Sequence, residues 1–121
     1  MPRPPGLFYA RNLLLYALQR YRWLPGGTLT LPSHGKPFEG LHRRVEQLER
    51  HHAQRLQEVK GWCREGPTTA AEAMRQMFRR PLGPHEQTFA LGEALAHLHW
   101  LWHRGEVRRT QEAGVYRFAA L

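Results

Sequence analysis

Residues 103–118, HRGEVRRTQEAGVYRF, decide the fold class of this chain. Gly105 is the residue type that most often follows the last turn of a helix. Two short strands, Glu106–Thr110 and Val115–Phe118, flank the segment Gln111–Gly114, and a glycine in so short a connection is typical of a hairpin. The stretch therefore predicts the end of a helix followed by a two-stranded β-hairpin.

Three helices are predicted upstream of this hairpin. The longest carries apolar residues at steps of three and four, which places them on one helix face. These stripe residues are Leu41, Val45, Leu48, His52, Leu56, Val59 and Cys63. A second helix, Ala70–Phe78, follows a capping box formed by Thr69 and Glu72. A third runs from about His85 to Arg104, so the element order is that of a winged-helix domain.

The residues before these helices follow a different pattern. Residues 1–6 are expected to be a loose Pro/Gly leader. Dense apolar residues over Leu7–Trp23 predict a helix, which the turn residues Leu24–Gly27 end. The alternation of polar and apolar residues over Thr28–Leu31 then predicts a short strand. Such a strand buries almost nothing alone, so its partners must come from elsewhere.

Composition limits the function classes. The chain has 18 Lys and Arg against 10 Asp and Glu, a formal net charge of +8, which suits nucleic acid or another acidic partner. The single cysteine, Cys63, excludes an internal disulfide framework and a multi-cysteine zinc module. No apolar run approaches the roughly 20 residues that span a bilayer, and we see no signal peptide. We therefore expect a soluble, cytoplasmic protein without a membrane partner.

The histidines do not form a catalytic cluster by their spacing. His99 and His103 share a helix face, but no nearby glutamate completes a zinc-protease motif. His51 and His52 are adjacent and face different sides of a helix. His34 directly follows the predicted strand in a Pro-Ser-His-Gly turn, a place where ligand-binding side chains concentrate. We identify no catalytic or cofactor-binding residue, and the pattern leaves open whether His34 is a ligand or a plain turn histidine.

Direct reading of DNA is disfavoured. In a winged helix that binds DNA, the third helix enters the major groove and should present Arg, Asn or Gln to the bases. The corresponding helix of this chain carries Glu86 and Glu93, whose carboxylates would repel phosphate. A free-standing winged-helix protein that binds nucleic acid therefore stays the alternative hypothesis.

The stretch Leu29–Phe38, LTLPSHGKPF, resembles the last metal-binding motif of metallo-β-lactamase-fold hydrolases of the glyoxalase II-like group. In that family a short strand ends in Pro-(Gly/Ser)-His-Gly, and the histidine binds metal. Residues 12–21 resemble the helix before that strand. Further segments resemble, in order, the C-terminal winged-helix extension that is also found in the β-lactamase-like endoribonuclease branch. They are Gly40–Arg44, His51 and His52 with Arg55, Gly66–Ala70, Phe89–Leu98 and Gly114–Arg117.

The resemblance implies a mainly α fold with a small β-hairpin. Residues 1–38 would be the C-terminal remnant of a metallo-β-lactamase-fold domain, and residues 39–121 a winged-helix-like C-terminal domain. His34 would be a ligand to zinc or another divalent metal ion. The family's His-x-His-x-Asp-His cluster, its separate histidine and its bridging aspartate are absent from these 121 residues. We therefore expect this chain alone to bind no metal tightly and to be inactive.

The function that the resemblance implies is that of a C-terminal fragment of a metal-dependent hydrolase. The complete protein would cleave an ester, thioester or phosphodiester, with a small-molecule ester or thioester or an RNA as its substrate. A homo-oligomer is among the expected assemblies, whereas a nucleic-acid partner is not favoured. A third hypothesis is a helical subunit whose strand Thr28–Leu31 completes the sheet of another chain, because an unpaired strand invites a partner.

Overall fold

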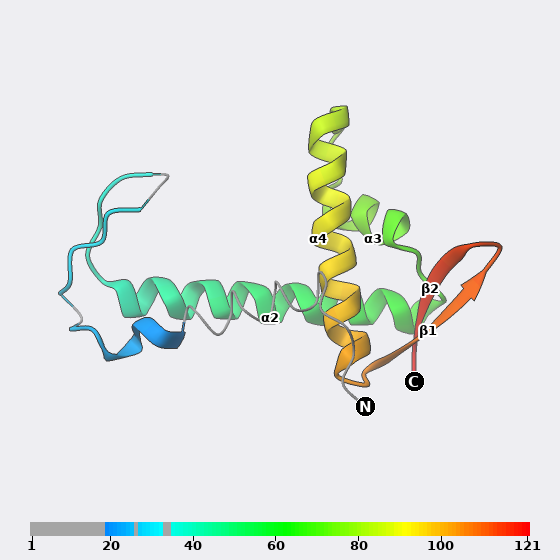
Figure 1. The fold of residues 1–121 in the computed structure, drawn as a ribbon, viewed down its shortest axis with the longest axis horizontal. Helices are drawn as coiled ribbons and strands as arrows, with labels where there is room; N and C mark the ends of the chain where they lie inside the picture. Colours follow the sequence, from blue (N-terminus) through cyan, green and yellow to red (C-terminus); the bar gives the residue numbers. More distant parts are fainter. Residues whose placement is uncertain (1–18, 26, 33–34) are drawn as a thin grey trace.

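The computed structural model describes residues 19–25, 27–32 and 35–121 (Figure 1). Much of the predicted helix Leu7–Trp23 lies outside these residues, as do Ser33 and His34. The described elements are the 3-10 helix η1 (Arg20–Trp23), the helices α2 (Leu41–Glu65), α3 (Ala70–Met77) and α4 (Pro84–His103), and the strands β1 (Val107–Glu112) and β2 (Val115–Ala120). The described part of the chain is thus mainly helical with one hairpin, as predicted.

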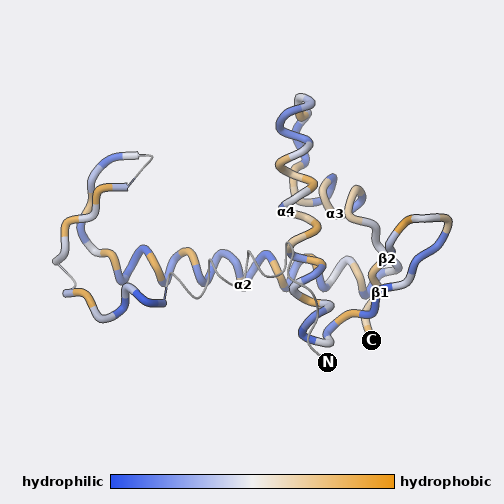
Figure 2. The backbone as a smooth tube through the Cα atoms, viewed as in Figure 1, coloured by the Kyte–Doolittle hydropathy of each residue, from blue (hydrophilic) through white to orange (hydrophobic). Residues whose placement is uncertain are grey.

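Helix α2 is 25 residues long and amphipathic. Its residues alternate between hydrophobic and hydrophilic along the helix (Figure 2). The three residues that it buries, Val45, Val59 and Cys63, all lie on the predicted stripe. Burial raises the pKa of the Cys63 thiol, which fits a core residue rather than a nucleophile.

The ends of α3 and α4 follow local capping rules. The Glu72 N–H donates to Thr69 Oγ1 and the Thr69 N–H donates to Glu72 Oε2, each at 3.2 Å, which confirms the predicted capping box. Helix α4 begins with Pro84, whose missing N–H costs nothing at a first helical position. It ends before Gly105, which has a φ of 73°.

The hairpin is longer than the prediction. Strand β1 pairs antiparallel with β2 from Val107 opposite Ala120 to Glu112 opposite Val115. Only Ala113 and Gly114 lie between them, with φ angles of 51° and 78°. Two consecutive positive φ angles give the tight turn whose twist matches that of the strands, so the predicted four-residue loop shrinks to two.

The other edge of β2 also has a partner. The Thr68 N–H donates to the Phe118 carbonyl oxygen at 2.8 Å, and the Phe118 N–H donates to the Thr68 carbonyl oxygen at 2.9 Å. Thr68 lies between α2 and α3. This antiparallel bridge attaches the hairpin to the connection between α2 and α3.

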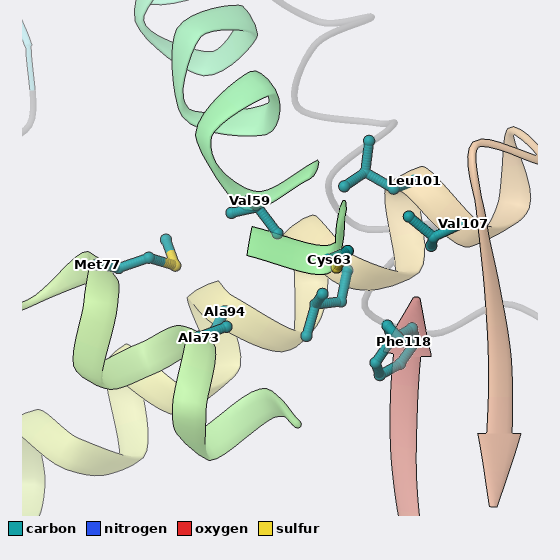
Figure 3. Close-up of a cluster of buried hydrophobic side chains, with 9 residues drawn as sticks. Val59, Cys63, Ala73, Met77, Ala94, Leu101, Val107 and Phe118 are labelled. Carbon is teal, nitrogen blue, oxygen red and sulfur yellow. The ribbon is translucent and has the colours of Figure 1, made fainter. Parts of the chain in front are cut away.

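The core lies where these elements meet (Figure 3). It is formed by Val59, Cys63, Ala73, Met77, Ala94, Leu98, Leu101, Val107 and Phe118. Every helix from α2 to α4 and both strands contribute to it. Ala73 and Ala94 are fully buried, and such small side chains let α3 and α4 approach closely. The core involves only the C-terminal half of α2. Figure 1 shows residues 28–32 and 35–40 at the opposite end of that helix.

The predicted strand Thr28–Leu31 is wrong, since it reduces to a single bridge between Thr30 and Phe38. The Thr30 N–H donates to the Phe38 carbonyl oxygen at 2.7 Å, and the Phe38 N–H donates back at 3.0 Å. The next hydrogen-bonded position on one side falls on Pro32, which has no N–H. On the other side, the Thr28 N–H donates instead to the Pro25 carbonyl oxygen at 3.1 Å. The ladder therefore stops after one pair.

No helix within the described residues is long and apolar enough to cross a membrane.

Candidate functional site

The predicted metal-binding turn is bracketed by the Thr30–Phe38 bridge. Gly35, directly after the candidate ligand, has a φ of 99°, a conformation that favours glycine. His34 itself lies outside the described residues, so the structure gives no position for its imidazole. What the described residues provide is the base of the turn, which joins its two ends through two backbone hydrogen bonds.

Within the described ranges, no group of three or more His, Cys, Asp or Glu side chains could hold a metal ion. A catalytic zinc site needs about three protein ligands and a water. The described residues thus provide no set of ligands of that size.

Two histidines come together where α2 crosses α4. The ring centroids of His52 and His97 are 6.5 Å apart, and those of His51 and His52 are 6.1 Å apart. His97 is only 2 % exposed, and its Nδ1 lies 2.6 Å from the Glu93 carbonyl oxygen, a contact that requires the proton on Nδ1. The position of His52 on the apolar stripe indicated that its side chain faces the packed side of the helix. No spacing in the sequence, however, pairs His52 with His97.

These histidines line a cavity of about 430 Å³ between α2, the connection from α3 to α4, and α4. Phe78 and Phe89 also line this cavity. Arg80 at its edge lies 2.7 Å from Glu86 Oε2, and its hydrogen bond lowers the pKa of the Glu86 carboxyl. Arg55 likewise pairs with Glu58. The cations around this cavity are therefore already matched by carboxylates, and the cavity is not an open anion site.

A second cavity, of about 670 Å³, lies at the other end of α2. It is mostly apolar. The apolar side chains that line it are Tyr21, Leu24, Leu29, Leu31, Phe38, Leu41, Val45 and Leu48. Lys36 and Arg44 add charge at its border. The cavity adjoins the base of the predicted metal-binding turn, because Thr30 and Phe38 belong to both.

Two of the three arginines of the hairpin, Arg109 and Arg117, contact other side chains of the chain. Arg109 lies with its Cζ 3.6 Å from the Trp102 ring centroid and 4.0 Å from that of Tyr116, and its Nη1 is 3.4 Å from His99 Nε2. Arg117 lies 3.4 Å from a Glu112 oxygen. Arg117 is thus paired with a carboxylate, whereas Arg109 keeps its positive charge in the stack and Arg108 is exposed.

The described fold, three helices followed by a two-stranded hairpin, has known counterparts. Residues 56–121 match the family model described as metallo-beta-lactamase-like, C-terminal domain, and the chain belongs to this family. It is similar to the solved structure of a beta-lactamase domain protein from Burkholderia ambifaria, with 50 % identity and a TM-score of 0.88. That similarity covers 92 % of this chain and 33 % of the Burkholderia chain.

A second similar structure is that of a metallo-beta-lactamase family protein from Thermus thermophilus. The identity is 29 % and the TM-score 0.78, over 96 % of this chain and 35 % of the other. The chain thus spans about a third of the length of either solved structure. None of the curated proteins compared with the chain matches it.

These similarities confirm the predicted relationship to metallo-β-lactamase-fold proteins and the C-terminal place of this chain in them. The glyoxalase II-like subgroup and the winged-helix description of the helices and hairpin stay predictions.

Proposed function

We propose that this chain is the C-terminal part of a metal-dependent hydrolase of the metallo-β-lactamase fold. In the complete protein, residues 1–38 would close the catalytic domain and supply His34 as one metal ligand. Residues 39–121 would form a winged-helix-like domain beside the mouth of the active site. The observation that carries this proposal is that the similarity to the Burkholderia protein covers 92 % of the chain, well beyond the family match at residues 56–121.

The local structure supports this division of the chain. Gly40, with a φ of 81°, separates the turn region from the start of α2 at Leu41. A neutral histidine imidazole is a common ligand of zinc and other divalent ions. Bound metal ions would supply an activated hydroxide and polarise the bond to be cleaved. Zinc is the metal we propose, and an ester, a thioester or a phosphodiester is the substrate class.

The test is a chimera in which this chain replaces the matching third of the Burkholderia protein. We expect it to bind metal and to hydrolyse at least one of three model substrates, an ester, a thioester or a phosphodiester. His34→Ala in the chimera should reduce kcat/KM by about 100-fold or more and lower the bound metal, because the loss of a ligand exceeds the loss of an outer partner. His85→Ala is the control, since His85 is an exposed histidine at the start of α4.

Retention of both metal content and activity in the His34→Ala chimera would contradict the assignment of His34. The isolated chain offers a second check by calorimetric zinc titration. With one proposed ligand of about three needed, it should show no tight stoichiometric binding. A nanomolar one-to-one site in the isolated chain would contradict the proposal that the other ligands lie elsewhere.

A further inference from the structure

The outer edge of the hairpin is a strand edge without a partner among the described residues. Phe118 of β2 directs both its N–H and its carbonyl oxygen to Thr68. In an antiparallel ladder the residue opposite, Arg109 of β1, then directs its own two groups away from β2. The same holds for every second residue of the strand, so Val107 and Gln111 share this outer edge. No described residue outside the hairpin forms a backbone hydrogen bond with these three edge residues.

The other side chains of β1 carry charges of both signs. Arg108, Thr110 and Glu112 alternate with the edge residues, so they share the face of the hairpin opposite to the one that holds Arg109. All three are exposed, and the Glu112 side chain is 77 % exposed although it pairs with Arg117. Charges on a natural edge strand commonly discourage another strand from pairing with it. On β1, however, the two charges have opposite signs and flank Thr110.

This order of charges is self-complementary. When two copies of β1 lie antiparallel with Thr110 opposite Thr110, Arg108 of each copy lies opposite Glu112 of the other. Opposite charges that face each other across two strands stabilise the pair. In the same register Arg109 lies opposite Gln111, and both residues present their free N–H and carbonyl groups to each other. The pairing therefore gives backbone hydrogen bonds on both sides of Thr110 and an ion pair at each end.

Neighbouring registers lack this match. The pattern of donors and acceptors lets the two strands slide only by steps that keep edge residues opposite edge residues. One such step places Arg109 opposite Arg109, and like charges directly opposite each other destabilise a pair. The step in the other direction places Arg108 opposite Gly114 in the turn, where it meets no carboxylate. The charges therefore select the register centred on Thr110.

We propose that β1 is a dimerisation edge, at which two copies of this chain join their hairpins into one antiparallel sheet about a two-fold axis at Thr110. Figure 1 shows the hairpin projecting from the three long helices. The interface is closed, because each copy uses its one β1 edge and the outer edge of β2 is bridged to Thr68. A second copy is the occupant that the charges favour, since its own Glu112 and Arg108 supply the matching signs. This inference is independent of the proposed hydrolase function.

The oligomeric state of the full chain tests the proposal. Sedimentation equilibrium should show a reversible monomer–dimer equilibrium at concentrations up to about 1 mM, because one pair of strands buries less surface than a stable interface does. Arg108→Glu places two carboxylates at each end of the pairing and should raise the dissociation constant by about tenfold or more. Arg43→Glu is the matched control, because Arg43 is an exposed arginine of α2. It should change the constant less than about twofold.

A charge exchange separates complementary pairing from an effect on folding. Glu112→Arg should weaken the dimer as Arg108→Glu does, because it also places like charges at both ends. Combined in one chain, the two substitutions restore opposite signs, so the dissociation constant of the double variant should return to within about fivefold of the wild-type value. A double variant that keeps its circular dichroism spectrum but does not recover dimerisation would overturn the proposed pairing.

Cysteine cross-linking tests the register. In Thr110→Cys the two sulfurs meet across the two-fold axis, where opposite Cα atoms are about 4.5 Å apart and within reach of a disulfide. Gln111→Cys is the control, because Gln111 of the second copy lies about 8 Å or more away along the strand, beyond that reach. Mild oxidation should link only the Thr110→Cys variant, and the native Cys63 is buried.

Three results would overturn the proposal. A full chain that stays monomeric at about 1 mM would leave the edge to a strand of another protein. Equal cross-linking of Thr110→Cys and Gln111→Cys would contradict the two-fold axis at Thr110. A dimer that Arg108→Glu and Arg43→Glu weaken to the same extent would place the interface elsewhere on the molecule.

Discussion

At the scale of single residues, Arg109 shows that a basic side chain counted in the net charge need not be a free surface charge. It contributes to the +8 charge of the chain, yet its guanidinium lies between Trp102 of α4 and Tyr116 of β2. Stacking on two rings ties the hairpin to the helix, and the desolvation of the guanidinium strengthens the attraction. Net charge alone does not distinguish such a residue from one that faces solvent.

Arg109→Ala should therefore lower the free energy of unfolding by about 1–2 kcal/mol, from the loss of two cation–π contacts. Urea denaturation measures this. Arg108→Ala is the control, because Arg108 is the exposed neighbour on the same strand, and its effect should stay within about 0.5 kcal/mol. Equal losses for the two variants would show that the stack contributes nothing particular.

The lowered pKa of His99 predicts how the stability of the folded chain depends on pH. Burial lowers the pKa of its imidazole below the usual 6.5, and the nearby charges of Arg109 and His103 lower it further. The unfolded chain therefore binds a proton at His99 more readily than the folded chain. Stability from this group is fully present above pH 6.5 and declines as the pH falls through 6.5 toward the lowered folded pKa.

We expect Tm to decrease as the pH is lowered from about 7.5 to about 5. In His99→Gln, Tm should decrease less steeply over the same range. His85→Gln is the control, because His85 is exposed, and it should leave the slope unchanged. A wild-type slope in His99→Gln would show that other groups cause the acid sensitivity.

At the scale of elements, the hairpin was predictable and the upstream strand was not. Gly114 and the flanking apolar residues are local signals, so they indicate a turn whatever surrounds them. The alternation over Thr28–Leu31 is equally regular, but the ladder that it needs stops at Pro32 and at the turn that holds Thr28. Alternation shows that a segment suits a sheet, and a neighbouring strand decides whether one forms.

The hairpin turn predicts a stabilising substitution. Ala113 has a φ of 51°, a left-handed conformation that costs an ordinary residue roughly 1 kcal/mol but that Asn adopts readily. Ala113→Asn should therefore raise the free energy of unfolding by about 0.5–1 kcal/mol. Ala113→Val should lower it, because a β-branched side chain tolerates this conformation poorly. Both effects are read from the urea midpoint, and a loss of stability in Ala113→Asn would contradict the turn geometry.

At the scale of the whole molecule, stability is concentrated at one end of α2. The buried cluster joins the C-terminal half of α2 to α3, α4 and the hairpin, whereas the N-terminal half of α2 buries only Val45. The described part of the chain is therefore one well-packed body with a projecting arm.

Substitutions of two leucines compare how much each region contributes to the free energy of unfolding. Leu98 is fully buried in the core, and Leu48 is half-buried on the arm. Leu98→Ala should cost about 2–5 kcal/mol of unfolding free energy, whereas Leu48→Ala in the isolated chain should cost less than about 1.5 kcal/mol. Chemical denaturation followed by tryptophan fluorescence measures both. Similar losses would mean that the arm contributes to the same cooperative core.

The sequence by itself determined the helices, their caps, the hairpin, and the relationship to metallo-β-lactamase-fold proteins. These features depend on spacing and on residue types that act within a few positions of one another. Only the tertiary structure decided that His52 meets His97 and that Arg109 is stacked on Trp102 and Tyr116. Those pairs lie on different elements, and the packing of helices against one another, which no local pattern encodes, brings them together.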